Sequence, residues 1–283
     1  ELRASTRELS LLARARRWSH ALERLQELRL GRLQPDTILF NAALSACDKA
    51  QRPVPALALL SELHSRGFEP TPATCGAAVS ACAGGQRWQR AMVLLAEALF
   101  WELKLDEVIC GAAVAACQRG GQWELALALI ARTWRRRVPP NVIACSAAVS
   151  ACERAGRPAA ALRLFAEMRQ RGPEPDVFTY TSVLTALAKD ERWEVAAQLL
   201  AEMRLGCLRP NVFASNAAIS AFEKAARWRR ALLLASRPGA DTVGLNAAVS
   251  ACEKAAEWVK AVMLLAIARS GMGPERHHPQ RSH

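Results

Sequence analysis

The sequence predicts an all-α fold, a right-handed α-solenoid built from stacked helix-turn-helix repeats of 35 residues. Two observations support this prediction. Tryptophans fall on one 35-residue ladder, at Trp18, Trp88, Trp123, Trp193 and Trp228. Short polar residues, most of them after a proline, recur at the same spacing, at Asp36, Thr71, Asp106, Asn141, Asp176 and Asn211. A fixed period of this length is typical of a solenoid.

Residues 177–211 are the clearest copy of the repeat. The first half of a repeat is a small-residue segment, as in Asn216 to Lys224, that begins just after a Pro-Asp or Pro-Asn boundary typical of a helix start. In the second half, apolar residues follow the i, i+3, i+4, i+7 spacing of a buried helical stripe, at Ala196, Ala197, Leu199, Leu200 and Met203. We therefore expect a pair of antiparallel helices that buries its apolar face by stacking on its neighbours.

The repeats are expected at 2–36, 37–71, 72–106, 107–141, 142–176, 177–211, 212–241 and 242–275. Residues 1–36 are expected to be a degenerate first repeat or cap, because Arg3, Arg7 and Glu8 interrupt its first helix; residues 37–275 form the seven-repeat array. The seventh repeat is five residues short, so a local kink is expected there. The polar tail, 276–283, is expected to be disordered. Because the chain opens on Glu1 without an intact targeting peptide, we expect its start to be missing.

The formal net charge of +12 indicates a polyanionic partner, either an acidic protein or a nucleic acid. A membrane partner is not expected, because no stretch of 18 or more apolar residues is free of polar breaks.

The nine cysteines are expected to be apolar packing residues. Cys75 and Cys82 lie seven residues apart, and so do Cys110 and Cys117, which is about 10 Å along one helix and too far for a direct disulfide. No Cys-x-x-Cys pair occurs, so neither a metal site nor a cofactor is predicted. We therefore expect the protein to work in a reducing compartment, where cysteines stay unpaired.

The period and these landmarks resemble the pentatricopeptide repeat family, as a P-type-like array over residues 2 to 275. The related tetratricopeptide repeat has 34 residues and a different pattern. The segment Asn246 to Lys254 looks most like pentatricopeptide proteins of dinoflagellate algae. The resemblance implies sequence-selective binding of single-stranded RNA, one base per repeat, in RNA processing, stabilisation or editing in a plastid or mitochondrion.

In that family the fifth and last residues of a repeat read one base. The resemblance therefore implies base-reading roles for Thr6, Asp36, Asn41, Thr71, Asp106, Asn141, Ser146, Asp176, Thr181, Asn211, Asn216, Asp241 and Asn246. The expected footprint is 5′-G-Y-N-N-G-A-U-N-3′. Gly76 and Gly111 lack the fifth side chain, so their repeats should read poorly, and Asn246 with Glu275 departs from the family's pairs.

Two further rows accompany the base-reading residues. The apolar second residues would sandwich the bases, although they could instead only close the helix start: Ile38, Val108, Ile143, Phe178, Phe213 and Val243. Ala73 and Arg3 break this row. Basic residues eight positions after the fifth residue would bind phosphates, or form a solvated helix face: Lys49, Arg119, Arg154, Lys189, Lys224 and Lys254. The acidic residues beside them, including Glu223, are expected only to pair on the helix surface.

The tryptophans open the second helices and are expected to pack in the core and not on bases. Neither the zinc motifs of the family's deaminase-like members nor a recurrent carboxylate pair or Gly-rich phosphate loop occurs, so we expect no enzymatic activity. The expected partners are single-stranded RNA and RNA-processing proteins, with the chain a monomer. The alternative is a protein-interaction scaffold whose groove binds an acidic peptide or partner.

Overall fold

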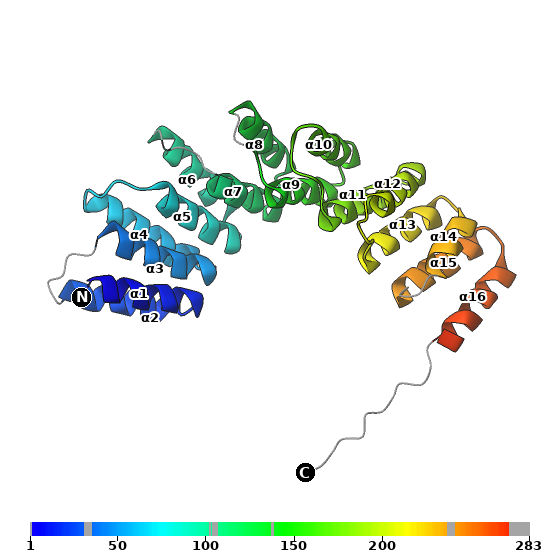
Figure 1. Cartoon of the computed structure of the whole chain (residues 1–283), viewed down its shortest axis with the longest axis horizontal. Coiled ribbons are helices and arrows are strands. Elements are labelled where there is room, and N and C mark those ends of the chain that lie inside the picture. Colours follow the sequence, from blue (N-terminus) through cyan, green and yellow to red (C-terminus); the bar gives the residue numbers. More distant parts are fainter. Residues whose placement is uncertain are drawn as a thin grey trace, which may run out of the picture. The chain divides into compact units, whose positions relative to one another are not determined.

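The computed structural model describes residues 2–30, 36–101, 103, 107–136, 139–236 and 241–271, and every regular element among them is an α-helix. The first helices of the repeats are α1 (Leu2–Arg14), α3 (Thr37–Lys49), α5 (Pro72–Gly84), α7 (Glu107–Arg119), α9 (Val142–Arg154), α11 (Val177–Lys189), α13 (Val212–Lys224) and α15 (Thr242–Lys254). The second helices are α2 (Trp18–Leu30), α4 (Pro53–Ser65), α6 (Trp88–Phe100), α8 (Trp123–Arg135), α10 (Pro158–Arg171), α12 (Trp193–Leu205), α14 (Trp228–Ala235) and α16 (Trp258–Gly271). The predicted succession of helical hairpins is confirmed (Figure 1).

The chain divides into two compact parts, residues 1–155 with 163–174, and residues 156–162 with 175–283. In the first part the first helices pack in chain order, α1 on α3, α3 on α5, α5 on α7 and α7 on α9, and α4 lies against both α3 and α5. In the second part α11 packs on α13 and α13 on α15, and α12 lies against both α11 and α13. Each part is therefore a stack of hairpins in which a second helix bridges two successive first helices.

The residue that closes one repeat caps the first helix of the next. Asp176 Oδ1 accepts a hydrogen bond from the backbone N–H of Thr179 at 2.8 Å, and Asn211 Oδ1 accepts one from Ala214 at 2.7 Å. The same contact is made by Asp36, Thr71, Asn141 and Asp241. Such a cap stabilises a helix by about 1 kcal/mol. The helix starts predicted at the polar boundaries are confirmed.

The tryptophans spaced by 35 residues or a multiple of 35 each begin a second helix. The two positions of this spacing that lack tryptophan hold Pro53 and Pro158, which begin α4 and α10. The guanidinium carbons of Arg227 and Arg230, from the next repeat, each lie 4.6 Å from the centroid of the Trp193 ring. Trp88 lies so close to the next repeat that a Cβ on Gly120 would be 2.3 Å from its ring. The five tryptophans are half-buried and not in the fully buried core that was expected, and these contacts place Trp88 and Trp193 against the following repeat.

The first helix of the first repeat is not interrupted, so that prediction is wrong. Helix α1 is continuous, and Arg7 and Glu8 are exposed on it. Arginine and glutamate are good helix formers, and Glu8 Oε2 pairs with Arg24 Nε of α2 at 3.0 Å. Charged residues on a solvent-facing side therefore leave the helix intact. The side chain of Arg3 lies outside those described.

The seventh repeat has a short second helix, as expected, because α14 ends after eight residues. The segment 237–240, where the kink was expected, lies outside the described residues, and so does the tail at 276–283.

A residue in the left-handed backbone region follows every first helix, which the sequence did not predict. Gln51, for example, has a φ of 56°, and its N–H donates to the carbonyl of Asp48 at 2.8 Å. The following N–H, of Arg52, donates to the carbonyl of Cys47 at 2.9 Å, so the last helical carbonyls are satisfied. Only two of these positions hold glycine; the full set is Arg16, Gln51, Gln86, Gly121, Gly156, Glu191, Ala226 and Ala256.

Eight of the nine cysteines are buried free thiols, and Cys207 is exposed. Burial raises the pKa of the Cys145 thiol to about 12 and that of Cys117 to about 11, and the Cys117 sulfur lies 3.7 Å from the Met92 sulfur. The predicted packing role is confirmed for these eight and is wrong for Cys207. No helix among the described residues is long and apolar enough to cross a membrane.

Thiol labelling should separate Cys207 from the other cysteines. We expect the native chain to take up one maleimide rapidly, because only Cys207 reaches solvent, and to take up nine after unfolding in guanidinium. Intact mass spectrometry measures both numbers. The Cys207→Ser variant is the control and should rapidly take up no maleimide while it is folded. Rapid uptake of two or more labels by the native wild type would contradict the buried packing.

Candidate nucleic-acid interface

A cavity of about 860 Å³ lies on the α11 and α13 layer of the second part. Its lining includes residues of all three predicted kinds: base-reading Thr181, Asn211 and Asn216, base-sandwiching Phe178 and Phe213, and basic Lys189 and Lys224. The hydroxyl residues Thr185 and Ser220 lie among them. The sequence placed these residues at corresponding positions of successive repeats, and the packing of α11 on α13 brings them to one surface.

The fifth and closing residues of a repeat come together in this part. The amide nitrogen of Asn216 donates to Asp241 Oδ2 at 3.0 Å, and the other carboxylate oxygen, Oδ1, accepts from the backbone N–H of Gly244 at 2.9 Å. In the preceding repeat, the Thr181 hydroxyl lies 3.4 Å from Asn211 Oδ1 and is 2.6 Å from the carbonyl of Val177. The predicted pairs are therefore neighbours in space.

Capping decides which polar atom a closing residue still offers to a ligand. Asn211 gives its only oxygen to the backbone of Ala214, so its free group is an NH₂ donor. Asp241 gives Oδ1 to the cap, and its Oδ2, which accepts one hydrogen bond from Asn216, can accept another. In this position an asparagine therefore offers a ligand a hydrogen-bond donor and an aspartate offers an acceptor, while both cap the helix.

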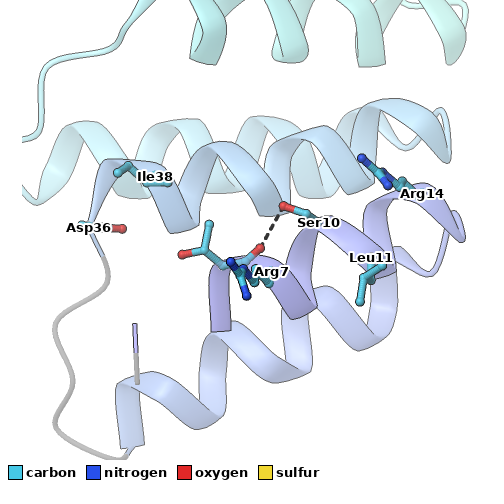
Figure 2. Close-up of a pocket in the computed structure, with 7 residues that line it drawn as sticks. Arg7, Ser10, Leu11, Arg14, Asp36 and Ile38 are labelled. Carbon is cyan, nitrogen blue, oxygen red and sulfur yellow. Dashed lines mark hydrogen bonds between the residues drawn. The ribbon is translucent and has the colours of Figure 1, made fainter. Parts of the chain in front are cut away.

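A second cavity, of about 720 Å³, lies between α1 and α3 in the first part. Figure 2 shows Arg7, Asp36 and Ile38 around it. Thr6, Asp36 and Ile38 line it, and they hold the repeat positions that Thr181, Asn211 and Phe213 hold in the other cavity. The same arrangement is therefore built independently in both parts.

Arg14 also lines this cavity and was missed by the sequence reasoning. It lies eight residues after Thr6, which is the spacing of the predicted basic row. Extending that row into the first repeat would have found it. Arg14 is exposed at the end of α1, as Lys189 is at the end of α11.

The six predicted base-sandwiching side chains are all exposed, from 51% for Phe178 to 75% for Ile143, with Ile38, Val108, Phe213 and Val243 between these values. Each lies two residues after the closing residue of the preceding repeat. Apolar side chains of this size are usually buried, so a row of exposed ones marks a surface that can contact a ligand.

The six predicted phosphate-binding residues, Lys49, Arg119, Arg154, Lys189, Lys224 and Lys254, are exposed as well. Lys254 Nζ lies 3.0 Å from Glu223 Oε1, which also accepts a hydrogen bond from the Ser250 hydroxyl at 2.9 Å. Pairing confined to one helix surface was expected and is wrong for Glu223, because its partners belong to the next repeat. The stacking of α13 on α15 brings them within reach.

The predicted base-reading residues of the first part make other contacts than the Asn216–Asp241 pair. Thr74 joins Asn41 to Thr71, because its hydroxyl is 2.7 Å from both Asn41 Oδ1 and Thr71 Oγ1. Ser146 is only 5% exposed and donates to the carbonyl of Ile143 at 3.0 Å. It belongs to the first part of the chain, whereas Asp176 belongs to the second.

Two predicted closing residues, Asp106 and Asn141, belong to repeats whose fifth residue is glycine, Gly76 and Gly111. A Cβ added at Gly111 would meet no atom within 4 Å, whereas one at Gly76 would lie 3.4 Å from Ile109 and 3.8 Å from Val108. Asn141 caps α9, and Asn246 is exposed on α15. Asp106 and Glu275 lie outside the described residues.

Solved structures with a similar fold are pentatricopeptide repeat proteins. The crystal structure of the pentatricopeptide repeat protein PPR10 with an 18-nt psaJ RNA element matches 97% of this chain with a TM-score of 0.73 and 18% identity. PPR10 from maize matches 96% with a TM-score of 0.63 and 23% identity. The chain spans 41% and 45% of the length of these two. The pentatricopeptide repeat domain of Arabidopsis thaliana protein-only RNase P 1, in complex with tRNA, matches 68% of this chain and 97% of its own, with a TM-score of 0.58 and 14% identity.

Family models agree with this fold. The PPR repeat family matches residues 140–189, and the PPR repeat matches residues 178–206. No curated protein sequence gives a significant match. Residues 140–206 therefore match pentatricopeptide repeats, and the chain has the fold of pentatricopeptide repeat proteins.

Proposed function

We propose that this protein binds single-stranded RNA sequence-selectively, with one base read by each repeat. The observation that carries the proposal is the cavity between α11 and α13, where exposed aromatic, hydrogen-bonding and basic residues lie together. RNA-binding surfaces for single strands combine these three chemistries, because bases stack on apolar side chains, base edges form hydrogen bonds, and phosphates need positive charge.

The arrangement in this cavity suits one nucleotide per repeat. Phe178 and Phe213 occupy the same place in successive repeats and are 51% and 74% exposed, so each offers a surface to a base. Stacking of a base on an aromatic side chain contributes roughly 1–3 kcal/mol. Thr181 and Asn211 lie between these rings in the chain and would contact the base edge, while Lys189 and Lys224 would bind the backbone.

The similar structures support the same reading. PPR10 and the repeat domain of protein-only RNase P 1 were each solved with RNA bound. We therefore propose a non-enzymatic role in organellar RNA processing, stabilisation or editing, with the footprint 5′-G-Y-N-N-G-A-U-N-3′. An acidic peptide is the competing ligand, because the net charge of +12 would attract it too.

A binding titration at two salt concentrations tests the proposal. The purified chain is titrated with 5′-GCAAGAUA-3′ and with 5′-GCAACUCA-3′, in which GAU is replaced. We expect tighter binding to the first RNA, and weaker binding to both at higher salt. Equal affinity for the two RNAs would contradict the base-reading assignments, and no binding to either would favour the acidic-peptide scaffold.

Lys224→Ala should weaken binding to all RNAs by a similar factor. Lys224 is exposed at the cavity and is proposed to contact a phosphate, so its loss should lower the salt slope by about 0.7 without changing base preference. Arg209→Ala is the charge-matched control, because Arg209 is exposed in the loop that precedes α13 and does not line the cavity. A loss confined to one RNA sequence, or an equal loss in the control, would refute the phosphate contact.

A further inference from the structure

The third residue of one repeat lies against the fifth residue of the repeat before it. Thr74 has this relation to Asn41 in the first part, and Gly244 has it to Asn216 in the second part. Both asparagines hold the predicted base-reading position, yet their amide groups are held in opposite ways.

The amide of Asn41 is held by its oxygen. The Thr74 hydroxyl donates to Asn41 Oδ1 at 2.7 Å, and Thr74 is fully buried, so this hydroxyl has no water to bind instead. Thr74 Oγ1 also accepts from the backbone N–H of Thr71 at 3.2 Å, which fixes its position. Because this hydrogen bond fixes the amide with its oxygen toward Thr74, the NH₂ group is the part of Asn41 left for a ligand.

The amide of Asn216 is held by its nitrogen. Its NH₂ group donates to Asp241 Oδ2 at 3.0 Å. Its oxygen lies over Gly244, where an added Cβ would be only 2.5 Å away. The absence of a side chain at Gly244 therefore makes the space that the amide oxygen occupies, and that oxygen is left as an acceptor.

We propose that the third residue of the following repeat is a positioning residue, which sets whether a base-reading asparagine presents a donor or an acceptor. Thr74 turns Asn41 to present a donor, and Gly244 lets Asn216 present an acceptor. The inference rests on the proposed RNA-binding function and adds a specificity determinant to it.

Base chemistry then distinguishes the two repeats. Cytosine has an acceptor at N3, which suits the NH₂ group of Asn41, whereas uracil carries a hydrogen there and would oppose it. The N3–H of uracil suits the acceptors of Asn216 and Asp241 instead. The second base of the footprint is therefore C, and the seventh is U.

The test compares Thr74→Val with Thr74→Ser. Valine keeps the shape of threonine but removes the hydroxyl, and serine keeps the hydroxyl. Affinities are measured for 5′-GCAAGAUA-3′, for 5′-GUAAGAUA-3′ with U at the second base, and for 5′-GCAAGACA-3′ with C at the seventh base. The wild type should prefer C at the second base by roughly tenfold, which is the value of one hydrogen bond.

We expect Thr74→Val to lose this second-base preference and keep the seventh-base preference, and Thr74→Ser to keep both. Gly244→Ala should weaken the seventh-base preference without abolishing it and keep the second-base preference, because its Cβ displaces the Asn216 oxygen while Asp241 remains an acceptor. A variant that merely loosened the stack would weaken both preferences together.

Three results would overturn the inference: a Thr74→Val protein with an unchanged second-base ratio, a Thr74→Ser protein that loses that ratio, or a wild type that does not distinguish C from U there. If the wild type still selects GAU over CUC, the proposed function survives that failure. If it binds neither RNA, both proposals fall.

Discussion

The double variant Thr181→Asn, Asn211→Asp should prefer U where the wild type prefers A. These changes copy the Asn216–Asp241 pair, whose amide and carboxylate are 3.0 Å apart, into the repeat at 177–211. Ala214 keeps the place that Gly244 holds beside that pair, so the preference is expected from the new carboxylate. The Asn211 amide donor is replaced by a carboxylate acceptor, which suits the N3–H of uracil and not the corresponding acceptor of adenine. A hydrogen-bonded base contact contributes roughly 1–3 kcal/mol of discrimination, so the ratio of affinities for 5′-GCAAGUUA-3′ and 5′-GCAAGAUA-3′ should invert.

Helix stability should survive this exchange. Asn211 caps α13 through its Oδ1, and aspartate is an equally good cap, so the melting temperature should change little. The residue after the cap is the same as before, and Phe178 and Phe213 are untouched. Asn211→Asp alone serves as the matched control for the change of net charge. An unchanged preference for A in the folded double variant would refute the code for this array.

Raising the pH above about 9 should unfold the first part of the chain before the second. Burial is the main cause that raises the thiol pKa of Cys47, Cys75, Cys117 and Cys152 from 9.0 to about 11, and that of Cys145 to about 12. All five lie between residues 47 and 152 and are almost fully buried. At the position of Cys152, the next two repeats have Leu187 and Phe222, which do not ionise, and the second part has one buried thiol, Cys252, whose pKa is also raised by burial.

The sign of the effect follows from proton binding. Below pH 9 each thiol is protonated in both states, so its stabilising contribution is fully present. Between pH 9 and about 11 the unfolded thiols lose protons that the folded ones keep, and each costs about 1.4 kcal/mol of unfolding free energy per pH unit. The loss of unfolding free energy summed over five such thiols would exceed the stability of a typical domain within one or two pH units.

Hydrogen exchange measured by mass spectrometry from pH 8 to pH 11, under reducing conditions, shows which helices unfold first. We expect helices α3 to α9 to lose protection at a lower pH than α11 to α15. The chain has one tyrosine, so phenolate formation adds little. Replacing Cys47, Cys117 and Cys152 by alanine should flatten the pH dependence, although it lowers stability at neutral pH. Simultaneous loss of protection in both parts would contradict the assignment to buried thiols.

Much of the fold could be predicted because its signals are local in sequence. A proline followed by Asp176 or Asn211 predicts a helix start by capping alone, and Trp193 marks the next start. The left-handed residues at Glu191 and Ala226 gave no signal, because such turns usually carry glycine.

The site was less predictable, because its geometry depends on neighbouring repeats. The rows of second and fifth residues could be read from the period. The amide orientation of Asn41 could not, because it is set by Thr74, 33 residues further along and brought close by stacking. The pairing of Glu223 with Lys254, 31 residues away, has the same origin.

In the proposed function the closing residue both caps a helix and reads a base, and this limits which RNA targets are accessible by mutation. Because it must cap the next helix, only the few side chains that accept a backbone hydrogen bond are tolerated there. Aspartate and asparagine meet that demand equally, and their codons are neighbours in the genetic code. If the proposed function holds, a point mutation at Asn211 or Asp241 would change the preferred base while the helix cap is kept, so the RNA target could change one repeat at a time.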